Sequence, residues 1–428
     1  MPDSVPEPHS RAGEIAGDLF RRESARLVAM LTGQFGTHRL QLAEDAVQEA
    51  LVRALQTWPY RGVPENPAAW LTQTARNLAL DHLRREQNWN EKQEGIACEH
   101  PRWLATPGPR EENADTFTDD TLRMMFVCFH PQLSTEAQVA LALRTLCGLS
   151  PAEIAAAFLT SEAAIAKRLV RARQRIRELA LPFVVPAPDE LPARLDGVLA
   201  TLYLLFNEGY KASGGDRLVR AELCHEAIRL TLLVAAHPAT RRPRTHALLA
   251  LMLFNAARLT SRTDDAGNLL RLHEQDRATW NRGMIERGLH YLALASSGDA
   301  VSEFHLQAGI AACHSTARND ASTDWPRILA LYDHLAEINP SPIVALNRAV
   351  AVERVRGPQA GLLALDTMPN RAALESYHLA HAVRGTFLLK LSRRAEALAS
   401  FQKAEALAPI QSERDFIATL CQAAARAA

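Results

Sequence analysis

The chain has 428 residues, with 48 Lys or Arg and 48 Asp or Glu, so its formal net charge at pH 7 is zero. This balance excludes a whole-surface electrostatic grip on nucleic acid, and any basic surface must be local. The length predicts about two to four domains. The first residues lack the basic start and apolar run of a signal peptide, and no stretch is apolar enough to span a bilayer. We therefore expect a cytoplasmic protein.

The cysteines give no sign of a metal site or a disulfide framework. Six are scattered along the chain, and none forms a C-x-x-C pair. Cys98 and His100 lie close together in the sequence, but two ligands do not make a site. We expect reduced thiols, no metal and no cofactor.

The first segments predict a tail and a helical domain. Residues 1–12 are rich in proline and polar side chains, which predicts a disordered tail. A helical domain is expected over 13–90. Within it, Glu44 and Asp45 open a helix, because acids suit the positive end of the helix dipole. Its apolar stripe leaves four polar side chains available for a partner: Asp45, Gln48, Glu49 and Arg53.

Residues 58–67, W-P-Y-R-G-V-P-E-N-P, contain three prolines and a glycine, which predicts a loop. Its aromatic, arginine and asparagine side chains could contact an unpaired base, and a stiff connector is the alternative. A helix over 70–86 follows, with polar residues on its outer face. The polar, proline-containing residues 91–119 predict a linker, and a second helical domain is expected over 120–180.

The stretch 150–177 has the pattern of a helix-turn-helix. Ser150 and Pro151 suit the start of a short helix, and Thr160 or Ser161 can cap a second one. The second helix places Ile165, Leu169, Ala172, Ile176 and Leu179 on one stripe. Its other faces carry Lys167, Arg168, Arg171, Arg173, Arg175 and Arg177. Such a helix could meet phosphates and base edges of DNA, and a solvated basic face is the alternative.

Three segments in this order resemble a known family. A-E-D-A-V-Q-E-A-L-V-R-A at 43–54 and W-L-T-Q-T-A-R-N-L-A-L-D-H-L-R-R at 70–85 resemble the promoter-melting domain of bacterial extracytoplasmic-function (ECF) sigma factors. T-S-E-A-A-I-A-K-R-L-V-R-A-R at 160–173 is similar to the family's domain that reads the −35 element. Together these segments cover roughly the first 180 residues.

The resemblance implies roles for particular residues. The helix with Asp45, Gln48 and Glu49 would dock on the clamp coiled coil of the largest RNA polymerase subunit. The −10 strand would be captured by Trp58, Tyr60, Arg61, Asn66, Trp70, Arg76, Asn77, Arg84 and Arg85. The −35 duplex would be contacted by Thr160, Ser161, Lys167, Arg168, Arg171, Arg173 and Arg175. Asp81 also lies on a matching position, with a local pairing to an Arg as the alternative.

The rest of the chain is an extension that ordinary ECF factors lack. A proline-rich hinge is expected over 181–195, followed by an all-helical region over 196–428. Gly385, Ala397, Phe401, Ala404 and Pro409 have the offsets of a tetratricopeptide (TPR) repeat. L-Y-L-L-F-N-E-G-Y at 202–210 resembles the start of the extension in an ECF subgroup with a long TPR-like extension. The whole chain is thus expected to be all-α: two small domains followed by a helical solenoid.

Three functional hypotheses follow. The first is a sigma factor that directs core polymerase to −35/−10 promoters, starts melting and is regulated in cis by its extension, on which a protein or small-molecule effector could bind. The second is a helix-turn-helix regulator with a TPR-like partner-binding domain that does not engage core polymerase. The third is an enzyme using carboxylates such as Glu208 and Asp276. Acids on solvated helix faces or in internal hydrogen bonds are commoner, so we assign no catalytic residue and expect no enzyme.

Overall fold

The structure is a computed structural model that describes residues 23–94, 114–157, 160–210, 219–264, 270–298, 300–368, 374–408 and 411–426. The predicted tail at 1–12 and most of the predicted linker at 91–119 lie outside these residues. The chain divides into two compact units, Met1–Thr201 (unit 1) and Leu202–Ala428 (unit 2). The described part is helical and contains no β-strand, as the sequence predicts.

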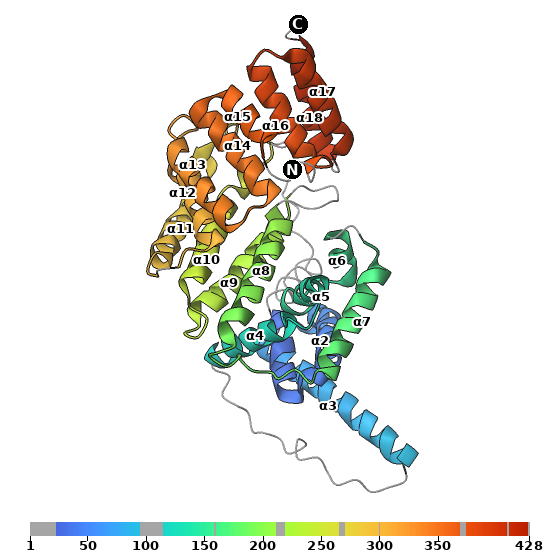
Figure 1. Cartoon of the computed structure of the whole chain (residues 1–428). Coiled ribbons are helices and arrows are strands. Elements are labelled where there is room, and N and C mark those ends of the chain that lie inside the picture. The colour runs from blue at the N-terminus through green and yellow to red at the C-terminus, as the bar shows by residue number, and fades with distance from the viewer. Residues whose placement is uncertain are drawn as a thin grey trace, which may run out of the picture. The chain divides into compact units, whose positions relative to one another are not determined.

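Unit 1 is built from α-helices of very different lengths, from 7 residues in α5 to 28 in α3 (Figure 1). After a helix over residues 23–35, the elements are α2 (Leu40–Arg61), α3 (Pro67–Glu94), α4 (Ala114–Cys128), α5 (Thr135–Leu141) with a π-helical turn at Ala142–Leu146, α6 (Pro151–Ala157) and α7 (Glu162–Glu178). The long helix α8 (Leu191–Tyr210) crosses the boundary between the units. Its first part packs on unit 1, where the guanidinium of Arg194 donates to the carbonyl of Phe126 at 2.5 Å.

Two boundaries in unit 1 differ from the sequence prediction. Helix α2 begins at Leu40, so Glu44 does not open the helix but lies within it, and is buried. The same helix continues through Pro59 to Arg61, so the predicted loop over 58–67 shrinks to its second half. The helix ends only where Gly62 adopts a φ of 80°, a conformation that glycine accepts without a steric penalty.

Unit 2 is a stack of antiparallel helices, in which most neighbours in sequence pack on each other (Figure 1). Its elements are α9 (Ala221–Ala236), α10 (Pro243–Ala256), α11 (Arg282–Ala295), α12 (Glu303–Thr316), α13 (Trp325–Ile338), α14 (Pro342–Arg356), α15 (Pro358–Asp366), α16 (His378–Lys390), α17 (Arg394–Leu407) and α18 (Gln411–Arg426). This arrangement agrees with the helical TPR-like solenoid predicted from the sequence.

Glycine allows close helix packing at two places in this stack. A Cβ at Gly385 of α16 would lie 2.6 Å from the ring of Phe401 on α17, and a Cβ at Gly288 of α11 would lie 2.7 Å from the ring of Phe254 on α10. Ala397, Phe401 and Ala404 are fully buried, as the TPR offsets predict. The fifth predicted position, Pro409, lies outside the described residues.

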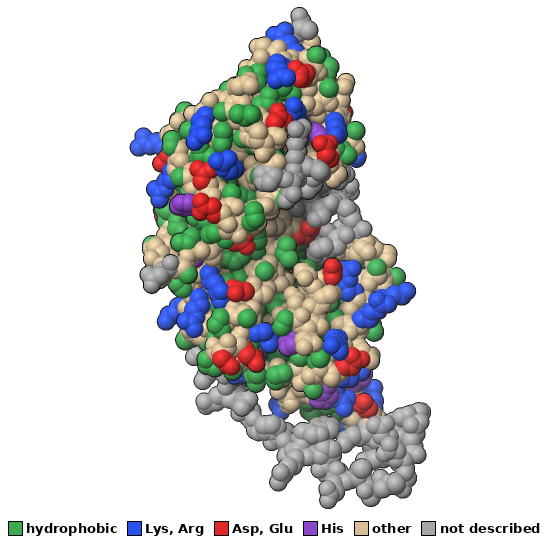
Figure 2. All heavy atoms as spheres, viewed as in Figure 1, with side chains coloured by type: hydrophobic (Ala, Val, Ile, Leu, Met, Phe, Trp, Pro, Cys, Tyr) green, Lys and Arg blue, Asp and Glu red, His purple; other side chains and the backbone are tan. Residues whose placement is uncertain are grey.

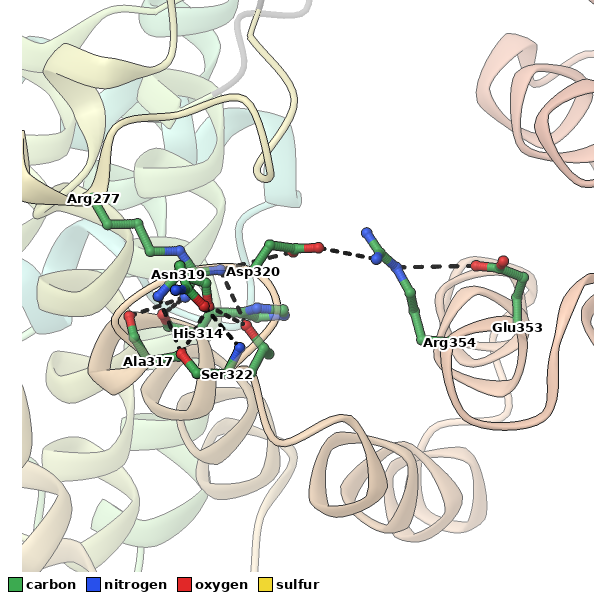
Figure 3. Close-up of polar contacts among 9 residues, drawn as sticks. Arg277, His314, Ala317, Asn319, Asp320, Ser322, Glu353 and Arg354 are labelled. Carbon is green, nitrogen blue, oxygen red and sulfur yellow. Dashed lines mark hydrogen bonds and ion pairs between the residues drawn. The ribbon is translucent and has the colours of Figure 1, made fainter. Parts of the chain in front are cut away.

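The polar cluster at 273–277 serves the internal structure of unit 2. Asp276 caps a short helical turn by accepting from the amide of Ala278 at 2.9 Å. The buried guanidinium of Arg277 donates to the carbonyls of His314 and Ala317 at 3.0 and 3.1 Å (Figure 3). It thereby satisfies carbonyls at the end of α12, which otherwise lack intrahelical partners. This geometry fits a structural role for the cluster better than paired catalytic carboxylates.

From Arg277 the network continues toward the later helices (Figure 3). Asp320 lies 3.9 Å from Arg277 and 2.9 Å from Arg354, and Lys390 reaches Glu353, the neighbour of Arg354, at 2.7 Å. These pairs join the loop before α13 to α14 and α16. Over the described chain, no helix is long and apolar enough to cross a membrane, and no group of three His, Cys, Asp or Glu side chains could hold a metal ion.

Candidate nucleic-acid interface

Helix α7 has the geometry that the sequence predicts for a recognition helix. The Ser161 hydroxyl caps it by accepting from the amide of Ala164 at 3.2 Å. Four members of the predicted stripe, Ile165, Leu169, Ala172 and Ile176, are buried, whereas Leu179 is only partly buried. The opposite faces of α7 therefore remain for a partner.

A groove of about 470 Å³ runs beside α7, between this helix and the segment that leads into α5. Lys167, Arg168, Arg171 and Arg175 contribute four cations to its walls, and Gln132 and Ser134 add polar groups. Lys167 and Arg171 are exposed, and neither has an ion-pair partner within the described part of the chain. In the space-filling view, basic and acidic side chains are interspersed, and no single basic patch covers the visible face (Figure 2). The basic surface is local, as the net charge requires.

Arg173 is placed differently from the other cations of α7. Its side chain is only 12% exposed, and its guanidinium donates to the carboxylate of Glu44 on α2. Glu44 is 3% exposed and also accepts from the Thr145 hydroxyl at 2.8 Å. Burial and the nearby Glu44 carboxylate raise the pKa of the Cys128 thiol. The two predicted domains, 13–90 and 120–180, thus meet in unit 1 through a buried ion pair.

The segment around 58–70 holds its aromatic side chains in two environments. Trp58 is 3% exposed and packs edge-on against Trp70, with ring centroids 5.6 Å apart. Tyr60 is 83% exposed, and Arg61 is also exposed. The Asn66 side chain accepts from the amide of Ala69 at 3.0 Å and so begins α3. Of the predicted base contacts in this segment, Tyr60, Arg61 and Asn66 are exposed, whereas Trp58 belongs to the core.

The predicted contacts on α3 share one outer face. Asn77, Arg84 and Arg85 are exposed, and Arg76 is half-buried. Asn77 accepts from Gln73 at 2.9 Å, and Arg84 pairs with Asp81 at 3.4 Å. The local pairing of Asp81 with an Arg is therefore present.

The predicted polymerase contacts lie on α2, and Asp45 and Glu49 are held by neighbours one turn away. Gln41 donates to Asp45 at 2.8 Å, and Glu49 pairs with Arg53 at 2.8 Å. Gln48 is half-buried between them. The structure adds Val52 and Leu55, which are exposed on the same helix. The helical periodicity of the sequence predicts Leu55 in the apolar stripe of this helix, and this prediction is wrong, because Leu55 is 43% exposed.

Two regions of unit 1 match family descriptions. Residues 19–89 match Sigma-70 region 2, and residues 123–176 match Sigma-70, region 4. Residues 194–296 match a family of unknown function (DUF6596). A relative in Rhizobium meliloti, "Uncharacterized protein R00370", is 41% identical over 88% of this chain and 89% of its own length.

This chain belongs to the ECF sigma factors with a long helical C-terminal extension. A second relative is the "Probable ECF RNA polymerase sigma factor SigI" of Mycobacterium tuberculosis. It is 27% identical over 54% of this chain and 83% of its own length. No solved structure matches the chain. Sigma-70 regions 2 and 4 imply binding to core RNA polymerase and promoter DNA, and sigma factors are not a class of enzymes.

Sequence reasoning missed Glu44 and Thr145, the partners of Arg173. One signal could have found Glu44: it lies at helical spacing from Leu40 and Val47, two buried residues of α2. A carboxylate in an apolar stripe is rarely buried unless it is paired. The identity of its partner, 129 positions further on, could not be read from the sequence.

Proposed function

We propose that this ECF sigma factor directs core RNA polymerase to −35/−10 promoters, starts strand separation there, and is regulated in cis by unit 2. The observation that carries the proposal is the groove beside α7, with four cations on a helix of a Sigma-70 region 4. Phosphates attract such a surface, and the exposed first turns of a recognition helix can reach base edges. In this proposal Thr160, Ser161, Lys167, Arg168, Arg171 and Arg175 contact the −35 duplex directly.

For the −10 strand, we assign stacking and phosphate contacts to the exposed members of the predicted set. Tyr60 is placed to stack on an unpaired base, a contact that contributes about 1–3 kcal/mol. Arg61, Asn77, Arg84 and Arg85 would hold the strand along α3. Trp58 supports this surface from within by packing on Trp70, and the exposed Asn66 supports it by capping α3.

For core polymerase, we propose that α2 docks on the clamp coiled coil. Asp45, Gln48 and Glu49 supply polar contacts, and the exposed Val52 and Leu55 supply apolar ones. Gln48, Val52 and Leu55 follow one another at spacings of four and three, so they share one helix face. A mixed face of this kind suits a helix that packs on other helices.

Run-off transcription with purified core polymerase tests the proposal. We expect a promoter-dependent transcript with this protein and none with core alone. Reversing the charge at Asp45 and Glu49 should weaken binding to core, whereas reversal at the exposed Glu65, on the loop before α3, should not. Equal binding by the two kinds of variant would remove α2 as the docking helix, and no transcript from any promoter would refute the function.

The regulatory role of unit 2 needs a truncation at the right place. The first half of α8 packs on unit 1, since Leu195, Val198 and Leu199 are buried and Thr201 lies 3.4 Å from Gln138. A chain ending near Pro186 would lose this packing, whereas one ending after Tyr210 would keep it. Transcription by the longer truncation should differ from that of the full-length protein at equal concentration. Equal transcript levels would exclude regulation in cis.

A further inference from the structure

Unit 2 contains a groove to which no function has been assigned. It has a volume of about 510 Å³ and is lined by residues of α8, α10, α12, α13 and α14 and of the segments between them. Binding sites for small organic molecules have volumes of roughly 300–1,000 Å³ and combine apolar walls with a few polar groups. The groove matches this description, because Phe254, Ile310 and Val344 line it beside Tyr203, Asn347 and Arg258.

The charge of a ligand in this groove would be determined by Arg258. Its guanidinium lies over the ring of Tyr210, 5.4 Å from the centroid, and donates to the side-chain oxygen of Asn255 at 3.3 Å. Within the described residues no carboxylate lies at ion-pair distance from it. A half-buried guanidinium that is oriented but not neutralised favours an anion, and its planar fork suits a carboxylate.

His314 and Ser315 line the groove together with Arg258. Nδ1 of His314 is buried and has no hydrogen-bond partner in the described structure. Its ring is fixed edge-on against Trp325, with centroids 5.3 Å apart. His314 therefore adds a fixed, largely buried ring to the wall beside Arg258.

The other end of the groove differs in charge. Glu303 at the start of α12 accepts from the Asn339 side chain at 2.9 Å, and Gln307, one turn further, accepts from the Tyr203 hydroxyl at 2.5 Å. Glu303 and His314 are about 16 Å apart along α12, at a helical rise of about 1.5 Å per residue. The anion-selecting end and the acidic end are therefore well separated, with apolar walls between them.

We propose that this groove binds an organic carboxylate with an apolar body, either a free acid or the carboxyl end of a short apolar peptide. The carboxylate pairs with Arg258, and Asn255 offers a hydrogen bond beside it. The apolar body lies along α12. This site deepens the proposed regulation by unit 2, because a ligand held across α10, α12 and α14 stabilises the stack by mass action.

Calorimetric titration of the full-length protein tests the site directly. The probes are octanoate, 4-phenylbutyrate and a tetrapeptide Ala-Ala-Val-Leu with a free carboxyl end, each compared with its neutral amide. We expect the acids to bind at least about tenfold more tightly than their amides, since an Arg–carboxylate contact is charge-assisted. Tighter binding of octanoate or 4-phenylbutyrate would indicate a free acid as the ligand, and tighter binding of the tetrapeptide would indicate the carboxyl end of a peptide. Equal binding of acids and amides, or binding of none of the acids, overturns the proposal.

Two groove variants and one control locate the site. Arg258→Gln should remove the preference for acids over amides. The control, Arg241→Gln, changes an exposed arginine that does not line the groove, and should leave this preference unchanged. Ile343→Glu places a negative charge at an exposed position on the wall of the groove. It should weaken the binding of the acids without disturbing the core of unit 2. Unchanged acid binding in both groove variants would refute the assignment. This result is independent of transcription, so its failure leaves the proposed sigma function untouched.

Discussion

The two units hold their buried charges in different ways. In unit 1 the pair of Glu44 and Arg173 joins residues 129 positions apart, from two sigma regions. In unit 2 the buried Arg277 and its partner Asp320 lie in neighbouring parts of a continuous stack of helices. The first contact joins two regions that are far apart in the sequence, whereas the second lies within one run of neighbouring helices. Local sequence patterns therefore say more about the packing of unit 2 than about that of unit 1.

The largest effect should come from the core of the stack. Phe401 is fully buried and packs on Gly385, so Phe401→Ala leaves a cavity between α16 and α17. We expect unit 2 to lose about 3–5 kcal/mol of unfolding free energy. Urea unfolding followed by circular dichroism measures this loss. Leu407→Ala, at an exposed position of the same helix, is the control, and equal losses in the two variants would contradict a continuous core.

The next effect is the pH dependence of unit 2. Burial, together with Arg258, Arg277 and Arg354, lowers the pKa of His314 from 6.5 to about 4, against the opposing charge of Asp320. Since the unfolded chain binds this proton more readily, unit 2 should lose stability as the pH falls from about 6.5 to 4. The loss from His314 should be at most about 3 kcal/mol.

A variant of His314 separates its contribution to the pH dependence from that of the other titratable groups. His314→Gln should flatten the fall in unfolding free energy between about pH 6.5 and 4, because the neutral amide binds no proton. His290→Gln, at an exposed histidine of α11, should retain the wild-type slope. If both variants keep that slope, His314 does not titrate as its burial implies.

A smaller loss is expected at the ion pair inside unit 1. Glu44→Gln removes the charge that Arg173 faces, and a buried unpaired donor costs about 1–3 kcal/mol. Because the amide oxygen of Gln can still accept a hydrogen bond from Arg173, we expect a loss near the lower end of this range. Urea denaturation measures it, with Glu65→Gln at an exposed position as the control. Equal unfolding free energies of the two variants would show that the ion pair does not stabilise unit 1.

The same contrast explains what the sequence could predict. Periodicity and capping residues identified α7, with Ser161 as its cap, and the TPR offsets identified the packing of Phe401 on Gly385, because both are local features. Glu44 was misplaced at the start of a helix, and the loop was predicted to begin too early. The burial of Glu44 depends on Arg173, far along the chain, and α2 continues through Pro59. Long-range contacts leave only an indirect trace in the sequence, here a carboxylate within an apolar stripe.

The smallest effect on stability, and the sharpest test of the open face of unit 1, is expected at Arg171. This side chain is exposed and lines the basic groove, so Arg171→Ala should leave the unfolding free energy almost unchanged. It should weaken −35 binding and reduce the slope of log K against log salt by about one unit, because one phosphate contact is lost. Arg177, exposed on the same helix but outside the groove, is the matched control. If Arg171→Ala and Arg177→Ala change the slope equally, α7 attracts DNA by its overall charge, and the groove does not direct the contact.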